Sequence, residues 1–134
     1  MSMRTYLVLA VCVLACAGCG TKEKTTPELL NDLQGTEDRD RVIAVRTLTN
    51  RRGDAAKVIP ALIEALKDKE SDIRWSAAIG LGAFGEQARD AIPALQTAQK
   101  DRDSRVREAA GRALSRIDPE KFPPGNTPPT AKRK

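Results

Sequence analysis

The sequence predicts an all-α protein built from about three consecutive 33-residue helix pairs that stack side by side. The first observation is a spacing: prolines stand at positions 27, 60 and 93, an interval of 33 residues that occurs twice. The second is a match without gaps, because Pro-Ala-Leu at 60–62 returns at 93–95. The third is the helical spacing of apolar residues within each unit. A repeat of this length cannot bury its apolar face alone, so the units are expected to form a solenoid.

The expected helices follow from the prolines and the apolar stripes. Counting from Pro27, we expect a lone short helix, two full pairs and a closing helix that ends near Ile117, six helices in all. The second helix of each unit should begin within a turn of its proline, where a missing N–H costs little. The apolar stripe of the first helix consists, in the middle unit, of Ile73, Ala77, Gly80, Leu81 and Phe84. The stripe of the proline helix consists of Ile59, Leu62, Ile63 and Leu66.

Residues 1–18 have the pattern of a secretory signal peptide, with Arg4 before an apolar run over 6–15 and small residues after it. The exit Ala17-Gly18-Cys19 resembles the lipobox of bacterial lipoproteins, in which the cysteine is acylated, for example with palmitate, and becomes the N-terminus. Cys16 is a competing position, and cleavage without lipid is the other alternative. We therefore expect a lipid on Cys19, a tether over 19–26, and attachment to a membrane on the exported side of the cell envelope.

Composition argues against several classes of function. The chain has no His, and its three cysteines, at 12, 16 and 19, all lie in the leader. The exported part therefore lacks the commonest general base and the usual metal ligands, and we expect no catalytic residues, no metal and no cofactor. Of the net charge of +5, Arg4 contributes one unit and residues 119–134 contribute three, which leaves +1 for the middle. Such a balance disfavours nucleic-acid binding.

The repeated residues resemble the short HEAT-like repeats of the class found in phycobilisome lyases. The motif is Pro-Ala-Leu, then Leu-Lys-Asp, then Ile or Val before Arg, then Ala-Ala with Leu, and it covers residues 27–118. The resemblance implies a right-handed α-α superhelix. It also implies a ladder of Asp and Arg side chains that ties adjacent units together, with Asp68 and Arg74 in one unit and Asp101 and Arg107 in the next. The alternative is an anion site lined by Arg41, Arg74 and Arg107.

Two surfaces are candidates for binding another protein. The resemblance implies that the proline helices line the concave side, which exposes Glu64, Lys67, Thr97 and Lys100, either as a binding groove or as a solvated surface. On a helical wheel Trp75 lies almost opposite the apolar stripe, with Ile79 close to it, so both are expected on the convex face. An exposed Trp beside an Ile is typical of an interface hot spot. The alternative is that neighbouring helices, or a C-terminal tail with Phe122, cover them.

Residues 119–134 contain five prolines and no apolar period, so we expect a disordered or polyproline-like tail with a basic end. The favoured function is a non-enzymatic, membrane-tethered interaction or scaffold module of the bacterial cell envelope, with another protein as its partner. One alternative is a tail-driven binder of an anionic envelope polymer or lipid surface. Another is a lyase-like or accessory enzyme.

Overall fold

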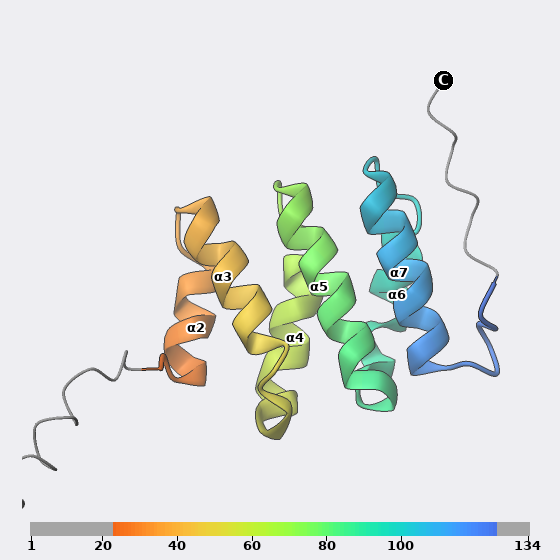
Figure 1. Cartoon of the computed structure of the whole chain (residues 1–134), viewed down its shortest axis with the longest axis horizontal. Coiled ribbons are helices and arrows are strands. Elements are labelled where there is room, and N and C mark those ends of the chain that lie inside the picture. Colours follow the sequence, from red (N-terminus) through yellow and green to blue (C-terminus); the bar gives the residue numbers. More distant parts are fainter. Residues whose placement is uncertain (1–22, 126–134) are drawn as a thin grey trace, which may run out of the picture.

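The computed structural model describes residues 23–125, and within this range the chain is α-helical without strands, as the sequence predicts (Figure 1). The described residues form the α-helices α2 (Thr26–Leu33), α3 (Asp38–Leu48), α4 (Ala55–Ala65), α5 (Ser71–Phe84), α6 (Ile92–Ala98) and α7 (Ser104–Ile117). Two 3₁₀ segments, η1 (Arg52–Asp54) and η2 (Gly85–Ala91), precede α4 and α6. The six expected helices are therefore present.

The helices pair differently from the expected order. Helices α2, α4 and α6 each pack against the helix that follows them along the chain. The pairs are therefore α2 with α3, α4 with α5, and α6 with α7. Within residues 23–125 no helix stands alone at the start, because α2 pairs with α3, and the proline helix is the first member of each pair rather than the second. Pro93 lies in the first turn of α6, as expected, but Pro60 lies inside α4, which begins at Ala55.

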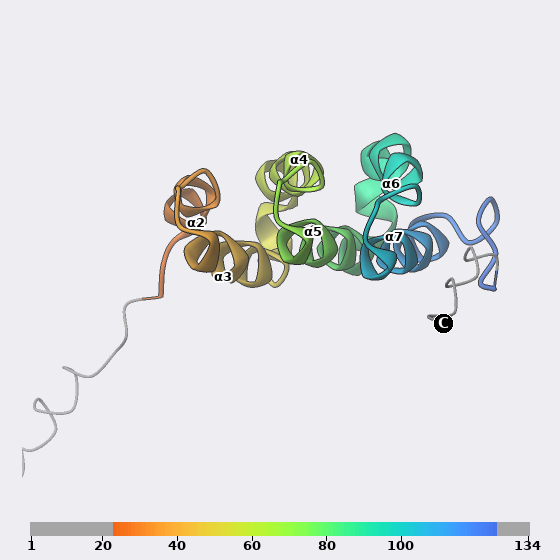
Figure 2. The ribbon, with the colours of Figure 1, turned by 90° about the horizontal axis from the view of Figure 1, so that it is seen from above.

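The three pairs form two layers, with α2, α4 and α6 in one and α3, α5 and α7 in the other (Figure 2). Helices α3, α5 and α7 pack directly on their neighbours, whereas α2, α4 and α6 have few contacts with one another. A stack of helix pairs curves toward the layer whose helices are closer together. The α3/α5/α7 layer is thus the concave one, and the expectation that the proline helices line the concave side is wrong. The error follows from the reversed order of helices within the pair.

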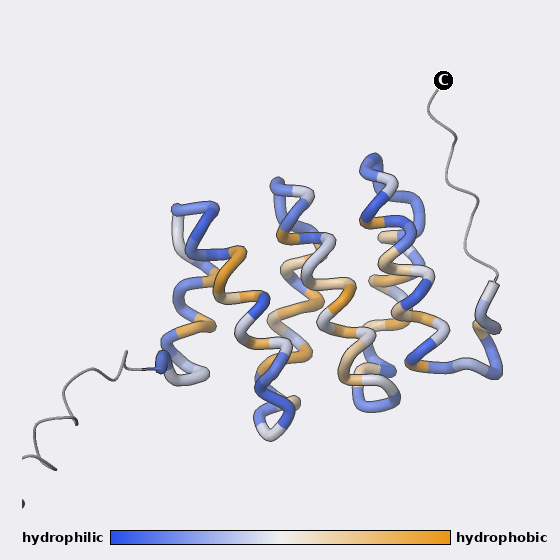
Figure 3. Tube along the Cα trace, in the orientation of Figure 1, coloured by the Kyte–Doolittle hydropathy of each residue, from blue (hydrophilic) through white to orange (hydrophobic). Residues whose placement is uncertain are grey.

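The core is formed by apolar residues of both layers. The hydrophobic residues lie along the helices, whereas the loops between the helices are mostly hydrophilic (Figure 3). Every member of the predicted stripe of α5 is buried, and so are Ile59, Leu62 and Leu66, while Ile63 is half-buried. Leu48, Leu81 and Leu114 occupy one repeat column, 33 residues apart, and none has any exposed surface. The repeat pattern in the sequence thus gives the core correctly.

Small residues bring α5 and α7 into close contact. A Cβ atom on Gly82 would lie 2.9 Å from the Cα of Ala113, closer than real carbon atoms approach without a shift of the helix. In the repeat column of Gly82 the other units hold Thr49 and Ser115. The tight contact of α5 with α7 therefore depends on a glycine that belongs to this unit alone.

A ladder of arginine and aspartate side chains joins the loops of successive pairs, as the resemblance implies. The Nε and one terminal nitrogen of Arg74 donate to the two carboxylate oxygens of Asp101 at 2.7 and 2.9 Å. The other terminal nitrogen donates to the backbone carbonyls of Asp68 and Lys69, each at 2.9 Å. Asp101 also accepts from the backbone N–H of Asp103 at 2.8 Å. The buried Arg74 side chain is therefore fully paired, which burial of a charge requires.

The ladder weakens toward both ends of the described solenoid. Arg41 reaches Asp68 at 3.4 Å, one unit before the Arg74–Asp101 contact. Arg107 donates to the backbone carbonyls of Asp101 and Arg102, as Arg74 does in its own loop. The ion pairs thus join the Arg of one unit to the Asp of the next, and this arrangement accounts for both residue types without an anion site.

Both ends of the repeat region differ slightly from the expected boundaries. Helix α2 starts at Thr26, whose hydroxyl donates to the carboxylate of Asp54, so Thr26 belongs to the fold and not to the tether. Phe122 packs against the core and its N–H donates to the carbonyl of Asp118 at 2.9 Å, so the expectation of disorder is wrong for the residues up to Phe122. The predicted leader with Cys16 and Cys19, and the tail from 126 onward, lie outside the described residues. None of the helices within residues 23–125 combines the length and the apolar composition that a membrane span requires.

We predict that Gly82→Ala lowers the free energy of unfolding by about 1–3 kcal/mol, because the added methyl group forces α5 and α7 apart. Ala has the higher helix propensity, so a loss of stability can only come from this contact. Gly53→Ala is the matched control, since a Cβ at position 53 meets nothing within 4 Å. Urea denaturation of the two variants measures the difference, and equal stabilities would mean that the helices are not in close contact.

We predict that Asp101→Asn costs about 2–3 kcal/mol at neutral pH, because it removes the charged acceptor of Arg74. The hydrogen bond from Arg74 lowers the pKa of Asp101 below its ordinary value. The folded state therefore binds this proton less readily than the unfolded chain, and the contribution of the pair is complete above the unfolded pKa of about 3.9 and lost as the pH falls through the lower folded value.

The variant should therefore lose less stability than the natural chain when the pH falls from 5 to 3 (roughly the titration range of a carboxyl group). Glu86→Gln, at an exposed carboxylate of η2, serves as the control. Parallel pH profiles of the thermal midpoint for the natural chain and Asp101→Asn would contradict this account of the ladder.

Candidate functional site

The exposed side of α3, α5 and α7, which we call the inner face, displays the repeat as rows of side chains. Residues 33 positions apart lie side by side on adjacent helices. The rows are Val42, Trp75 and Glu108; Arg46, Ile79 and Arg112; and Asn50, Ala83 and Arg116. Arg46 and Arg112 thus flank Ile79 in its own row. Helix α5, in the middle of the face, carries the two large apolar side chains, Trp75 and Ile79.

Trp75 and Ile79 border a hollow of about 140 Å³ between α5 and α7. Its other lining residues are Ala78, Gly82, Ala109 and Ala113, with Arg112 and Arg116 at the α7 side. The hollow exists because the helices meet through small residues, which leave the two large side chains standing above the contact. Ile79 keeps 40% of its surface exposed, and Trp75 is half-buried against the core.

The structure corrects two parts of the expectation for Trp75 and Ile79. They lie on the inner face, not on the convex one, because α5 is the second helix of its pair. On a helical wheel Trp75 lies almost opposite the buried stripe of α5, which predicts an exposed side chain. In the structure Trp75 is less exposed than that, because α7 packs alongside α5. The described part of the tail does not cover Trp75 and Ile79. Phe122 is not among the residues that line their hollow. Pro124 and Gly125 border a neighbouring hollow, beyond Arg112 and Arg116.

Sequence reasoning missed Ile43, which has 60% of its surface exposed and is the most exposed large apolar side chain among residues 23–125. It lines a second hollow of about 380 Å³ on the inner face, together with Arg39, Val42 and Asp72. A signal was present, because Ser76 and Ala109 occupy the same repeat column with far smaller side chains. A large residue in a column of small ones predicts a side chain that its own unit cannot bury.

Charges on the inner face are separated along the helices. At the amino ends, Arg105 of α7 bridges to Asp72 of α5 at 3.0 Å and to Asp103 at 3.0 Å. The hydrogen bond from Arg105 lowers the pKa of Asp103 to about 2, so this carboxylate stays ionised over the physiological range. Toward the carboxyl ends the charged side chains are Arg46, Arg112 and Arg116, of which Arg112 pairs with Glu108.

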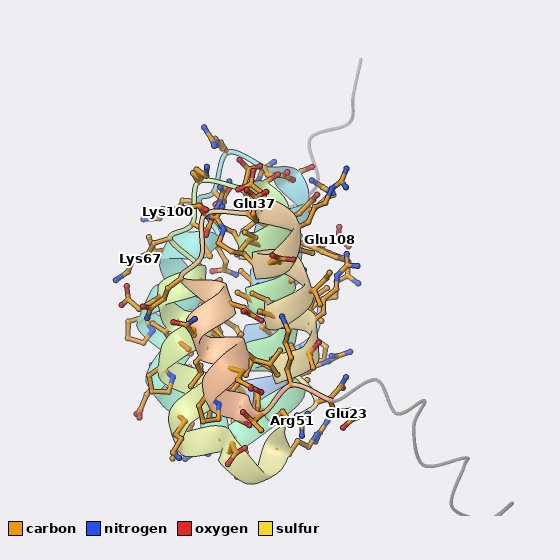
Figure 4. The ribbon with its side chains drawn as sticks, turned by 90° about the vertical axis from the view of Figure 1, so that its left-hand side faces the viewer. Glu23, Glu37, Arg51, Lys67, Lys100 and Glu108 are labelled. Atoms are coloured by element: carbon orange, nitrogen blue, oxygen red, sulfur yellow. The ribbon has the colours of Figure 1, made fainter. Side chains whose placement is uncertain are left out.

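The second candidate surface lies on the opposite side, where Lys67 and Lys100 project away from Glu108 (Figure 4). A hollow of about 350 Å³ between α4 and α6 brings together Lys67, Thr97 and Lys100. Glu64 lines a different hollow but pairs with Lys67 at 2.9 Å. All four side chains are exposed, as expected. They belong to the layer of α2, α4 and α6, which we call the outer layer, and their role in binding stays a prediction.

Three carboxylates, those of Asp38, Glu70 and Asp72, line the hollow beside Ile43 on the inner face. Within residues 23–125 there is no cluster of three or more His, Cys, Asp or Glu side chains with a geometry suited to a metal ion. The arginines of the alternative anion site are already engaged, with Arg74 bound to Asp101 and Arg107 to backbone carbonyls. What the two surfaces offer chemically is apolar area, hydrogen bonds and charge.

The chain belongs to the HEAT-repeat family, because a family model described as HEAT repeats matches residues 26–115. A comparison with functionally characterised proteins finds no significant match. Among solved structures, a chain in the complex of CpcE and CpcF of phycocyanin lyase from Nostoc sp. PCC7120 is similar, with 28% sequence identity and a TM-score of 0.68. The similarity covers 78% of this chain but only 41% of that one, so the protein spans less than half the length of that relative.

Proposed function

We propose that this protein is a non-enzymatic interaction module, tethered to a membrane of the bacterial cell envelope, that binds another protein through its inner face. The observation that carries the proposal is the Trp75–Ile79 pair beside the hollow between α5 and α7. HEAT repeats supply a rigid stacked surface, and the solved relative is itself part of a two-protein complex.

Trp75 and Ile79 have the features of an interface anchor. Tryptophan is enriched among the residues that dominate binding energies, and such residues sit at the centre of an interface with polar groups around them. Here the apolar pair is central on the inner face, and Arg46 and Arg112 flank Ile79 in its row. Ile43 extends the apolar surface toward the first repeat. Ile79 at 40% exposure and Ile43 at 60% exposure supply apolar area that a partner would cover.

The non-enzymatic part of the proposal rests on composition and on the state of the charged side chains. The chain has no His, and its cysteines lie at positions 12, 16 and 19 only. The buried arginine of the described residues, Arg74, is paired within the ladder and is not available to a substrate. A fold of this kind hosts many functions. We therefore take the similarity to a lyase complex as support for a shared scaffold that binds another protein, and not for a shared reaction.

The tether brings the repeat region close to the membrane surface. From Cys19 to Thr26, where α2 begins, an extended chain reaches about 25 Å. Burial of acyl methylenes at ~0.8 kcal/mol each, over two or three chains, would make the attachment stable. The first repeat would then lie nearest the lipid, with the inner face running away from the surface.

We predict that Trp75→Ala weakens partner binding by about 2 kcal/mol or more while changing the thermal midpoint little, because the side chain contributes more to a partner than to the half-buried site it occupies. The measurement is recovery of the crosslinked or co-purified partner from solubilised membranes, alongside thermal unfolding of the purified variant. Phe84→Ala serves as the comparison for folding, since Phe84 is buried at 6% exposure and its truncation should lower stability by about 3–5 kcal/mol. If Trp75→Ala unfolds as easily as Phe84→Ala and binds its partner normally, Trp75 serves packing and the proposed site is wrong.

We predict that Cys19 carries the lipid. Cys19→Ala with Cys16 intact should give an unlipidated or wrongly cleaved protein that leaves the membrane fraction, because the acceptor sulfur is gone. Intact mass of the membrane-extracted protein reports cleavage and acylation together. Normal acylation of the variant would move the site to Cys16, and a natural chain with the mass of a cleaved, unmodified protein would remove the lipid from the proposal.

A further inference from the structure

The hollow beside Trp75 and Ile79 has an apolar floor and a cationic margin. Ala78 and Gly82 from α5 and Ala109 and Ala113 from α7 form the floor, where no side chain extends beyond a methyl group. Arg112 and Arg116 border it on α7, and Arg46 lies in the row of Ile79 on α3. An entering apolar side chain would therefore meet the guanidinium groups of Arg112 and Arg116 on the α7 side, while Arg46 lies on α3, beyond Ile79.

The arginines at this margin outnumber the carboxylates available to them. Arg112 pairs with Glu108, the one acidic side chain in these rows. The guanidinium groups of Arg46 and Arg116 make no ion pair or hydrogen bond with another residue of 23–125, and both side chains are exposed. Two guanidinium groups with unused donors thus flank an exposed apolar pair, and such groups recognise carboxylates with bidentate geometry.

The chain's own remaining segment is a poor occupant for the hollow. The chain continues past Gly125, which lies near Arg112 and Arg116, with a stretch that includes Lys132, Arg133 and Lys134 and no acidic residue. Bringing this stretch to the hollow would oppose like charges. A second copy related by a twofold axis through the hollow would place Arg112 and Arg116 against their own counterparts, which disfavours that symmetric dimer.

We propose that the occupant is a segment of another protein in which a large apolar side chain stands next to one or more Asp or Glu residues. This inference rests on the proposed function, because it assigns the chemistry of the partner that the inner face binds. The apolar side chain enters the hollow against Trp75 and Ile79, and the carboxylates accept hydrogen bonds from Arg46, Arg116 and the outer nitrogens of Arg112. Charge complementarity of this kind sets specificity and the association rate more than total affinity.

A structural role for the same arginines makes a different prediction. Arg46 and Arg116 lie in the last turns of α3 and α7, where a positive charge stabilises the helix end. If that were their whole purpose, reversing their charge would reduce stability and leave binding unchanged. Binding and unfolding must therefore be measured on the same variants.

The test is a selection of short random peptides, displayed on phage, against the detergent-solubilised full chain, followed by affinity measurement with the selected peptides made synthetically. We expect enrichment of sequences that combine Asp or Glu with a Leu, Ile, Phe or Trp, and affinity that falls as salt is added. The double variant Arg46→Glu/Arg116→Glu should bind these peptides at least about tenfold more weakly. The double variant Arg52→Glu/Arg89→Glu, at exposed arginines outside the hollow, carries the same change of net charge and should bind normally.

Each outcome separates this inference from the proposed function. Selected peptides that are neutral or basic, but lose affinity with Trp75→Ala, overturn the acidic partner and leave the inner face as the binding site. Peptides that bind Trp75→Ala as well as the natural chain overturn the inner face itself. Binding of a synthetic peptide of residues 126–134 to a chain truncated after Gly125, or a dimer in sedimentation that Arg116→Glu abolishes, would make the occupant this chain's own tail or a second copy and so overturn the proposal.

Discussion

The buried guanidinium of Arg74 is the interaction on which the arrangement of the helix pairs depends. It joins two backbone carbonyls of its own loop to the carboxylate of Asp101 in the next, at distances of 2.7 to 2.9 Å. Apolar burial holds the layers together without direction, whereas this set of hydrogen bonds has a geometry that permits one spacing between pairs. The register of the rows on the inner face follows from that spacing.

Because the register of the helix pairs is fixed, residues that differ between repeats lie side by side on the inner face and give it a local binding surface. Trp75 and Ile79 stand in rows where the neighbouring helices carry Val42, Arg46, Glu108 and Arg112. Because α5 and α7 approach closely through Gly82 and Ala113, the large side chains of α5 border a hollow instead of a filled groove. The same stacking that buries the core thus leaves an apolar site with charged neighbours on the exposed side of the inner layer.

The sequence predicted the fold and the core better than the faces. The period of 33 places Leu81 in the core, because its column of leucines recurs in each unit. The ladder that pairs Arg74 with a neighbouring loop was implied by the resemblance to HEAT-like repeats. The repeat does not reveal which of two alternating helices comes first in a pair. That order depends on the connections: residues 66–70 form a tight turn between α4 and α5, while η2 fills 85–91 between α5 and α6. Reversing the order of the two helices within a pair exchanges the concave and convex sides. A helical wheel drawn for α5 alone also cannot include the packing of α7, which half-buries Trp75.

The most direct test of the inner face as a docking surface is site-specific photo-crosslinking in living cells. A photoreactive residue replaces Ile79 on the inner face or, as the control, the exposed Gln96 on the outer layer. The account predicts a discrete crosslinked adduct at position 79 that Trp75→Ala diminishes, and none at position 96. Adducts at 96 but not at 79, from protein that is folded and present at normal levels, would contradict it.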